Sequence, residues 1–242
     1  MENNILQVKD LKKYFGKTKA VDEISFNLNK GEIIFLTGPN GAGKTTTIKC
    51  ILGLLRKTNG EIFIKGESIK NKEIRSKLAY IPESPDVYPM LTVWEHLKFM
   101  ALAYRINNWE EYGEKILQSF NLLDKKNEVG KNLSKGMKQK LSICCSLVHK
   151  PDIFFIDEPM IGLDPQAIKE LKNILKMLKD QGKTLLISTH ILDSAEGLCD
   201  SIIIMKKGKI IEQGSIKELR EKLNADDCVT VEDMFLEVTS GE

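Results

Sequence analysis

One stretch of nine residues constrains the fold of this 242-residue chain more than any other. It reads Gly38-Pro39-Asn40-Gly41-Ala42-Gly43-Lys44-Thr45-Thr46 and fits the pattern G-x-x-x-x-G-K-[ST] at every defined position. An apolar run of strand length, residues 32–37, precedes it, and residues 46–55 carry apolar side chains at helical spacing. A strand, a glycine turn and a helix N-terminus in this order aim backbone N–H groups at one point. The stretch therefore predicts a phosphate-binding loop rather than a glycine-rich turn beside an unrelated lysine.

Two side chains at the end of this loop indicate nucleoside triphosphate chemistry. Lys44 brings a positive charge for the β- and γ-phosphates, and the Thr45 hydroxyl is placed to ligate Mg²⁺.

A pair of carboxylates follows a second apolar run, residues 153–156. Four consecutive apolar residues are typical of a parallel strand that is buried on both faces, and such strands carry chemistry at their C-terminal ends. We expect Asp157 to orient Mg²⁺ and Glu158 to accept a proton from an attacking water. The alternative, that both only cap the next helix, is weaker beside a phosphate-binding loop.

A second helix start that could bind an anion occurs at residues 133–140. Ser134 can cap this helix, and Gly136 allows a phosphate to approach the backbone. From the residues alone, this interpretation and that of a well-capped helix with no ligand are equally supported.

The remaining pattern predicts an α/β chain. Strands are expected at residues 5–8, 24–28, 61–67, 78–81 and 183–190, with a basic turn at 12–17 and a hairpin at 201–213. Residues 84–150 are expected to be mainly helical, with a capping box at Thr92 and Glu95 followed by apolar residues at helical spacing. A helix is expected from Pro165 with Asp164 as its N-cap, and residues 215–242 form a helical tail.

Composition narrows the class of protein. A net charge of +2 on a chain with 29% charged residues makes no case for nucleic acid as a partner. The five cysteines show no C-x-x-C spacing, which favours reduced thiols over a metal site. We see no secretion signal at the N-terminus and no apolar run of the ~20 residues that span a bilayer.

Taken in order, these motifs resemble the nucleotide-binding subunits of ABC transporters over nearly the whole chain. The phosphate loop is similar to the Walker A motif of that family, and residues 153–158 to its Walker B strand with the catalytic Glu158. Residues 133–137, which include Met137, resemble the signature motif, residues 162–164 with Asp164 the D-loop, and His190 the switch histidine. Tyr14 falls where the family stacks adenine, with Val21 against the base.

The resemblance implies one ABC ATPase domain over residues 1–242. Residues 1–83 and 151–214 would form a P-loop NTPase core with a mainly parallel sheet and an N-terminal antiparallel β subdomain. Residues 84–150 would form an inserted helical subdomain, and residues 215–242 the C-terminal tail.

Three departures from the family pattern stand out. Lys135 and Met137 replace residues of the usual Leu-Ser-Gly-Gly-Gln signature. The side chain of Lys135 is expected either near a γ-phosphate or in solvent. Glu83 stands where a glutamine is usual and could still offer Mg²⁺ an oxygen. The D-loop begins with Met160 and Ile161 where small polar residues are common.

The resemblance also implies a mechanism and partners. Two such subunits would close around two ATP molecules, with Ser134 and Gly136 of one subunit serving the nucleotide of the other. Together they would drive separate transmembrane permease subunits from the cytoplasmic face of the membrane, as a peripheral protein. Residues 88–93 and 231–236 are similar to those of the group that exports drugs or peptides. The alternative is a soluble ABC-type ATPase in assembly work such as iron–sulfur cluster loading.

Overall fold

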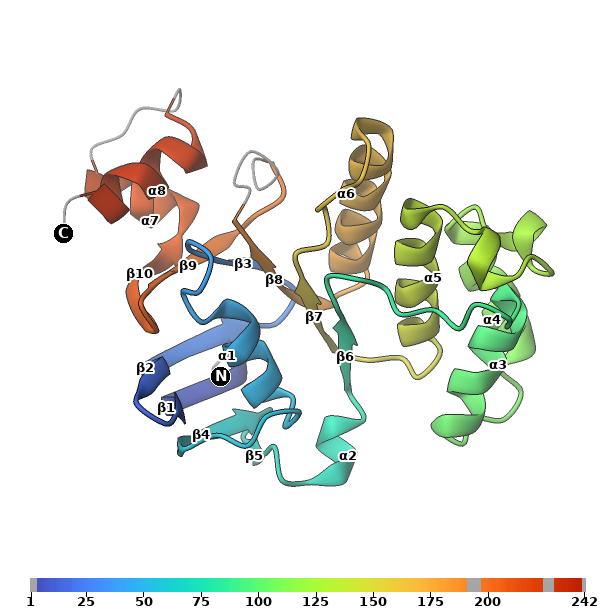
Figure 1. Ribbon diagram of the computed structural model, residues 1–242, viewed down its shortest axis with the longest axis horizontal. Coiled ribbons are helices and arrows are strands. Elements are labelled where there is room, and N and C mark those ends of the chain that lie inside the picture. The colour runs from blue at the N-terminus through green and yellow to red at the C-terminus, as the bar shows by residue number, and fades with distance from the viewer. Residues whose placement is uncertain (1–3, 191–196, 224–228, 241–242) are drawn as a thin grey trace.

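The computed structural model describes residues 4–190, 197–223 and 229–240, which form two sheets and a set of helices (Figure 1). The first sheet has four antiparallel strands in the order β2-β1-β4-β5. These strands are β1 (Asn4–Phe15), β2 (Thr18–Asn29), β4 (Asn59–Ile64) and β5 (Glu67–Ser68). This arrangement confirms the antiparallel N-terminal sheet that the resemblance implied.

The second sheet has six strands in the order β10-β9-β3-β8-β7-β6. They are β3 (Ile33–Thr37), β6 (Leu78–Ile81), β7 (Ile153–Asp157), β8 (Thr184–Thr189), β9 (Ser201–Lys206) and β10 (Lys209–Ser215). All neighbours run parallel except β10, which pairs antiparallel with β9. The carboxyl ends of β3, β7 and β8 therefore meet at one edge of the sheet, where the predicted phosphate loop and both carboxylates follow.

The strands at the centre of this sheet are apolar along their whole length because both of their faces are covered. Ile33 and Phe35 of β3 pack against the helices, whereas Ile34 and Leu36 pack into the space between the two sheets. The helix α1 (Lys44–Ile51) lies in that space, between the sheets (Figure 1).

The other helices cover the six-stranded sheet and extend beyond it. Between residues 84 and 150 the helices are α3 (Val93–Ala103), α4 (Glu110–Ser119), α5 (Lys135–Leu147) and two 3₁₀ turns, Leu123–Lys125 and Gly130–Asn132. They form a lobe on one side of the molecule (Figure 1, green). The remainder are α2 (Lys72–Arg75), α6 (Pro165–Asp180), α7 (Ile216–Leu223) and α8 (Val231–Ser240). The lobe shares one hydrophobic core with the sheet. Among the described residues, no helix is long and apolar enough to cross a membrane.

The structure changes several expected boundaries. The segment 12–17, expected to be a basic turn, continues β1 to Phe15 and turns only at Gly16 and Lys17. Pairing of Tyr14 with Lys19 across the hairpin stabilises this longer strand. The first helix, expected to reach residue 55, ends at Ile51. The capping box of Thr92 and Glu95 and the N-cap at Asp164 are both confirmed.

Candidate nucleotide site

The loop that follows β3 is shaped by two close backbone contacts. A Cβ on Gly38 would lie 2.2 Å from the carbonyl oxygen of Met205, and one on Gly43 would lie 2.3 Å from that of Ala20. Both glycines also have positive φ, 149° and 108°. Only glycine fits these two positions, and the loop then opens α1 at Lys44.

The Lys44 side chain lies over its own loop. Its Nζ donates to the carbonyl oxygen of Gly38 at 2.7 Å and lies 3.5 Å from Glu158 Oε1. The residue is only 6% exposed. A buried ammonium at the N-terminus of α1 makes the loop attractive to anions.

Asp157, at the end of β7, is held by three hydroxyl groups. Thr45 Oγ1 donates to Asp157 Oδ1 at 2.9 Å, and Ser188 Oγ donates to the same oxygen. Tyr80 lies 3.4 Å from the other oxygen. Burial, together with the negative charge of Asp157, raises the pKa of Tyr80 to about 12. Tyr80 therefore stays protonated at neutral pH and remains a donor to this carboxylate.

Glu158 adopts a backbone conformation that is rare for residues with a side chain. Its φ is 45°, and its N–H donates to the carbonyl oxygen of Ser188 at 3.0 Å. Such strain persists only where the surroundings hold it, and it is common at functional sites. The side chain is directed to Lys44 and to His190, whose Nδ1 lies 3.0 Å from Glu158 Oε1. The backbone N–H of His190 also donates to Glu158 Oε2 at 3.2 Å.

Of these groups, Lys44, Thr45, Glu158 and His190 line one cavity of about 540 Å³. Its lining residues are Ala20, Asn40, Gly41, Ala42, Gly43, Lys44, Thr45, Thr46, Glu83, Glu158, Ile161 and His190. The structure thus brings together Lys44, Glu83, Glu158 and His190, which are far apart in the sequence. Pro39 belongs to the same loop, and its carbonyl oxygen lies 3.4 Å from Lys44 Nζ.

The donor set at this cavity fits a triphosphate with Mg²⁺. Thr45 and Asp157 already place two oxygens together, and Glu83 adds a third on the same cavity. Mg²⁺ binds through one or two carboxylates and substrate phosphates rather than a full protein cage. Accordingly, the described residues contain no cluster of three or more His, Cys, Asp or Glu side chains that could hold a metal alone.

The two residues expected at the base are placed differently from the rest. Val21 is fully buried in the core between the sheets, and neighbouring Ala20 lines the cavity instead. The Tyr14 hydroxyl donates to Asp22 Oδ1 at 2.6 Å, and this bond raises the pKa of Tyr14. The expectation that Val21 lies against the base is wrong, because a side chain inside the core cannot contact a bound base.

Sequence reasoning missed Phe15, the next residue along β1. The residue is 49% exposed, and Lys13 Nζ lies 4.5 Å from the centroid of its ring. Tyr14 and Phe15 are adjacent in the sequence, and only the tertiary structure shows that the Tyr14 hydroxyl is bonded to Asp22 while Phe15 stays half exposed.

The helix start at Ser134 lies outside this cavity. Ser134 Oγ accepts from the backbone N–H of Met137 at 3.2 Å, which confirms the predicted cap of α5. Met137 itself packs against the hydrophobic core. Asp164 Oδ1 likewise accepts from the N–H of Ala167 at 2.9 Å. None of Ser134, Gly136, Met137 or Asp164 lines the cavity around Lys44.

Lys135 is exposed to solvent, which is one of the two expected positions, but its ammonium is bonded within the chain. Its Nζ donates to the backbone carbonyl oxygen of Ile161, so the side chain crosses to the turn after β7. Neighbouring Gly136 faces α6, because a Cβ there would lie 3.3 Å from Ala167 Cβ.

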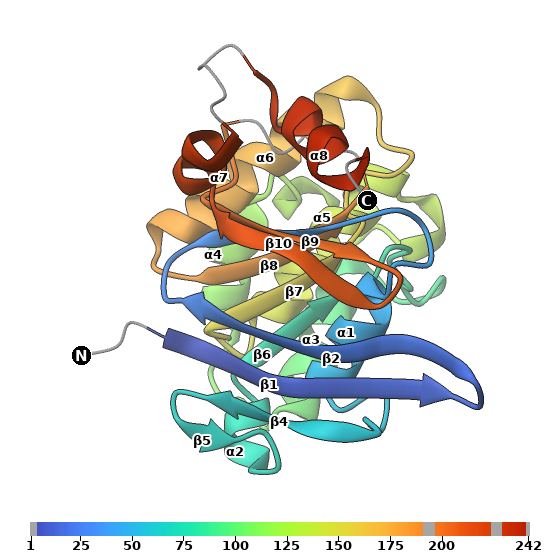
Figure 2. The ribbon, with the colours of Figure 1, turned by 90° about the vertical axis from the view of Figure 1, so that its left-hand side faces the viewer.

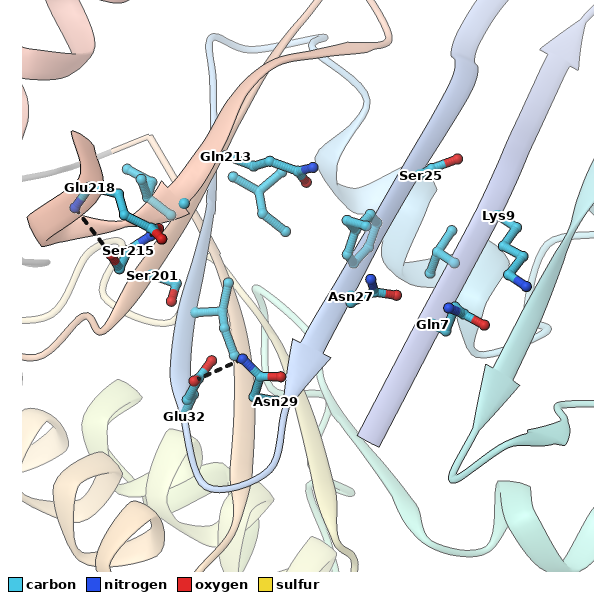
Figure 3. Close-up of a pocket in the computed structure, with 16 residues that line it drawn as sticks. Gln7, Lys9, Ser25, Asn27, Asn29, Glu32, Ser201, Gln213, Ser215 and Glu218 are labelled. Atoms are coloured by element: carbon cyan, nitrogen blue, oxygen red, sulfur yellow. Dashed lines mark hydrogen bonds between the residues drawn. The ribbon is translucent and has the colours of Figure 1, made fainter. Parts of the chain in front are cut away.

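A second cavity, of about 610 Å³, lies between the edge strands β2 and β10, away from the phosphate loop (Figure 3). Its acidic groups are already bonded within the chain: Glu32 accepts from Asn29 at 3.1 Å and Glu218 from the N–H of Ser215 at 2.7 Å. Figure 2 shows β10 above β2, and residues of both strands, together with residues of β1, β3 and β9, line this cavity. None of the residues predicted for the nucleotide site lines this cleft.

Comparisons with known proteins agree with this geometry. The sequence profile of the ABC transporter family matches residues 21–161. The ABC-type transporter ATP-binding protein EcsA of Bacillus subtilis (strain 168) is 38% identical over 99% of this chain and 98% of its own length. The SkfA peptide export ATP-binding protein SkfE of the same organism is 34% identical over 90% of this chain and 92% of its own length.

A solved structure described as the ATP-binding subunit of an ABC transporter superposes with a TM-score of 0.87. It is 36% identical, and the match covers 97% of this chain and 99% of that chain. The phosphate loop, Glu158 and His190 line one cavity, and Asp157 is bonded to Thr45 of that loop. With this site and these relatives, the protein belongs to the ABC transporter family as an ATP-binding subunit.

Proposed function

We propose that this chain hydrolyses ATP as one half of a dimer and thereby drives a separate membrane permease. One observation carries the proposal: Lys44, Glu158 and His190 line one cavity, whereas the Ser134 helix start lies elsewhere. Asp157 is hydrogen-bonded to Thr45, which lines the same cavity. A single chain therefore offers a phosphate site with a base but leaves its second anion-binding helix start unused. A second subunit placed head to tail would bring that helix start to the nucleotide.

Different residues of this chain would bind Mg²⁺ and the phosphates of the triphosphate. Thr45, Asp157 and Glu83 would hold Mg²⁺, which when bound neutralises charge on the phosphates. The backbone N–H groups of residues 38–46 and the Lys44 ammonium would position the phosphates and stabilise developing negative charge. Ser134 and Gly136 of the second subunit would add donors on the opposite side.

Glu158 would act as the general base toward the attacking water. Its carboxylate now lies within reach of both Lys44 and His190. Phosphate oxygens bind an ammonium more strongly than a single carboxylate does because they carry more charge. A bound triphosphate would therefore replace Glu158 as the partner of Lys44. Glu158 would then be held by His190 alone and could accept a proton from the water.

The base would stack on an aromatic ring of β1. Phe15 suits this role better than Tyr14 does. Phe15 is half exposed, whereas the hydroxyl of Tyr14 is bonded to Asp22. Ala20 would lie beside the sugar or base, in place of the buried Val21.

The permease would dock on the helical lobe. Exposed apolar side chains gather on and around α3: Tyr88, Met90, Phe99, Leu102 and Tyr104. Beside them, Leu54, Met100 and Tyr104 line a cavity of about 260 Å³ with the start of β6. Exposed apolar patches mark protein interfaces, and an amphipathic helix of a membrane subunit suits a groove of this kind. Such docking would place the protein peripherally on the cytoplasmic face.

Export is the proposed direction of transport. Support comes from SkfE, whose printed name describes peptide export. The alternative, a soluble ATPase in assembly work such as iron–sulfur cluster loading, has no support from these relatives, which are described as transporter or export proteins.

A Glu158→Gln substitution tests the proposal. We expect ATP turnover to fall about 100-fold or more, because the base is lost while Lys44 and Asp157 remain. The variant should then form a stable ATP-dependent dimer, measured by size-exclusion chromatography with light scattering. Glu111→Gln, on the surface of α4, serves as the control and should leave turnover unchanged. Full turnover in Glu158→Gln, or a monomer at saturating ATP, would contradict the mechanism.

A further inference from the structure

The first turn of α5 is bonded to the turn that follows β7. Lys135 Nζ donates to the carbonyl oxygen of Ile161. The same ammonium lies so close to the next residue that a Cβ on Gly162 would be 2.5 Å from it. This lysine therefore links two segments that the sequence separates by more than twenty residues.

The turn that Lys135 reaches is the one that carries Glu158. The N–H of Ile161 lies 3.4 Å from the carbonyl oxygen of Glu158, which closes a short turn. Ile161 also lines the phosphate cavity together with Glu158 and Lys44. A displacement of Ile161 thus moves the backbone that holds Glu158 in its strained conformation.

Two other contacts fasten α5 to the following helix. Gly136 packs on Ala167, near the start of α6. Lys140, further along α5, forms an ion pair with Glu170 of α6. The Lys140 pair ties helix to helix, whereas the Lys135 bond ties the helix start to the Glu158 turn. The two lysines therefore form a matched pair for an experiment.

We propose that Lys135 is a positioning residue that couples the Ser134 helix start of a subunit to Glu158 of that same subunit. The inference rests on the proposed dimer, in which Ser134 faces the nucleotide held by the partner. Closure on the partner's nucleotide would shift the start of α5, and the Lys135 bond would transmit that shift to Ile161 and Glu158. Each site would then be set for hydrolysis by the closure of the other.

The physical basis is a bond from a charged donor to a backbone carbonyl. Such bonds are stronger than neutral ones, but Lys135 is exposed to solvent, so its loss should spare the fold. Lys135→Met keeps most of the side-chain length and removes the donor, while Lys135→Arg keeps a donor of similar reach.

Steady-state ATP hydrolysis by the full-length chain gives the first test. Lys135→Met should lower kcat about fivefold or more, the lower end of typical coupling between sites, with little change in KM. Lys135→Arg should restore most of the rate. Lys140→Met should lower the melting temperature at least as much as Lys135→Met but leave kcat near that of the wild type. Wild-type kcat in Lys135→Met, or an equal loss in Lys140→Met, would overturn the proposal.

Mixed dimers, isolated with two different affinity tags, show on which site Lys135 acts. When one subunit carries Glu158→Gln, only the other subunit has an active base. Lys135→Met in the subunit with the active base should lower turnover, and the same change in the Glu158→Gln subunit should have no effect. The reverse result would mean that Lys135 contacts the partner's phosphates directly, and it would overturn the coupling.

The two proposals can fail separately. A homodimer of Glu158→Gln with Lys135→Met should still assemble with ATP. If Glu158→Gln alone fails to dimerise, the proposed function fails. If it dimerises but the mixed dimers show no dependence on the position of Lys135→Met, only the coupling fails.

Discussion

The Lys44 ammonium lies 3.5 Å from Glu158 Oε1, and both side chains are almost completely buried. Lys44 begins the helix after the phosphate loop, and Glu158 directly follows β7, which lies two positions from β3 in the sheet. The pair joins the group that binds phosphate to the group that would activate water. Binding and chemistry are therefore connected through a single side chain.

Base stacking should depend on Phe15 more than on Tyr14. Phe15→Ala should weaken ATP binding about tenfold, because stacking of a base on an aromatic ring contributes ~1–3 kcal/mol. Tyr14→Phe removes only the bond to Asp22 and should leave the affinity nearly unchanged. Titration of a fluorescent ATP analogue measures both. A large loss in Tyr14→Ala with none in Phe15→Ala would instead support the original assignment to Tyr14.

Docking of the permease should depend on the groove beside α3. Leu54 is 59% exposed and lines that groove, so Leu54→Lys places a charge there without disturbing the core. We expect ATP hydrolysis by the isolated chain to be unchanged and binding to the membrane subunits to weaken. Pull-down with the membrane subunits that co-purify with the wild-type chain measures binding. Leu236→Lys on α8, also exposed, is the control. Equal binding by both variants would exclude this groove.

Acid should destabilise the protein through His149. Its Nε2 lies 3.2 Å from the Leu78 carbonyl oxygen, and its ring stacks on Tyr104 with centroids 4.0 Å apart. Burial, with a smaller contribution from Lys77, holds the pKa of His149 below its ordinary 6.5. The unfolded chain therefore binds the proton more readily, so this contribution to stability is complete above pH 6.5 and is lost as the pH falls.

Melting temperature measured between pH 8 and pH 5 checks this expectation. Other groups titrate over the same range, so the difference between the wild type and His149→Gln is the informative quantity. That difference should favour the wild type most above pH 6.5 and shrink toward pH 5, because glutamine cannot take up the proton. A difference that stays constant with pH would show that His149 does not titrate on unfolding.

Much of the site was predictable because its signals are local. The two defined glycines of residues 38–46 are required by close backbone contacts, and the short sequence pattern of the loop includes them. The N-caps at Ser134 and Asp164 depend on bonds to residues three positions later in the chain. The apolar runs of β3 and β7 likewise predicted strands buried on both faces. The burial of Val21 was not predictable in this way, because it depends on the packing of the two sheets against each other. The longer β1 depends instead on pairing across its own hairpin, which the basic residues of the segment did not indicate.

The sequence alone therefore determined the phosphate loop, the carboxylate pair and the order of the motifs, because each motif consists of residues that are adjacent in the chain. Only the tertiary structure decided which atoms face each other: Glu158 with Lys44 and His190, Asp22 with Tyr14, and Ile161 with Lys135. The reason is that side-chain contacts between distant segments depend on how the sheets and helices pack, and no short pattern encodes that packing.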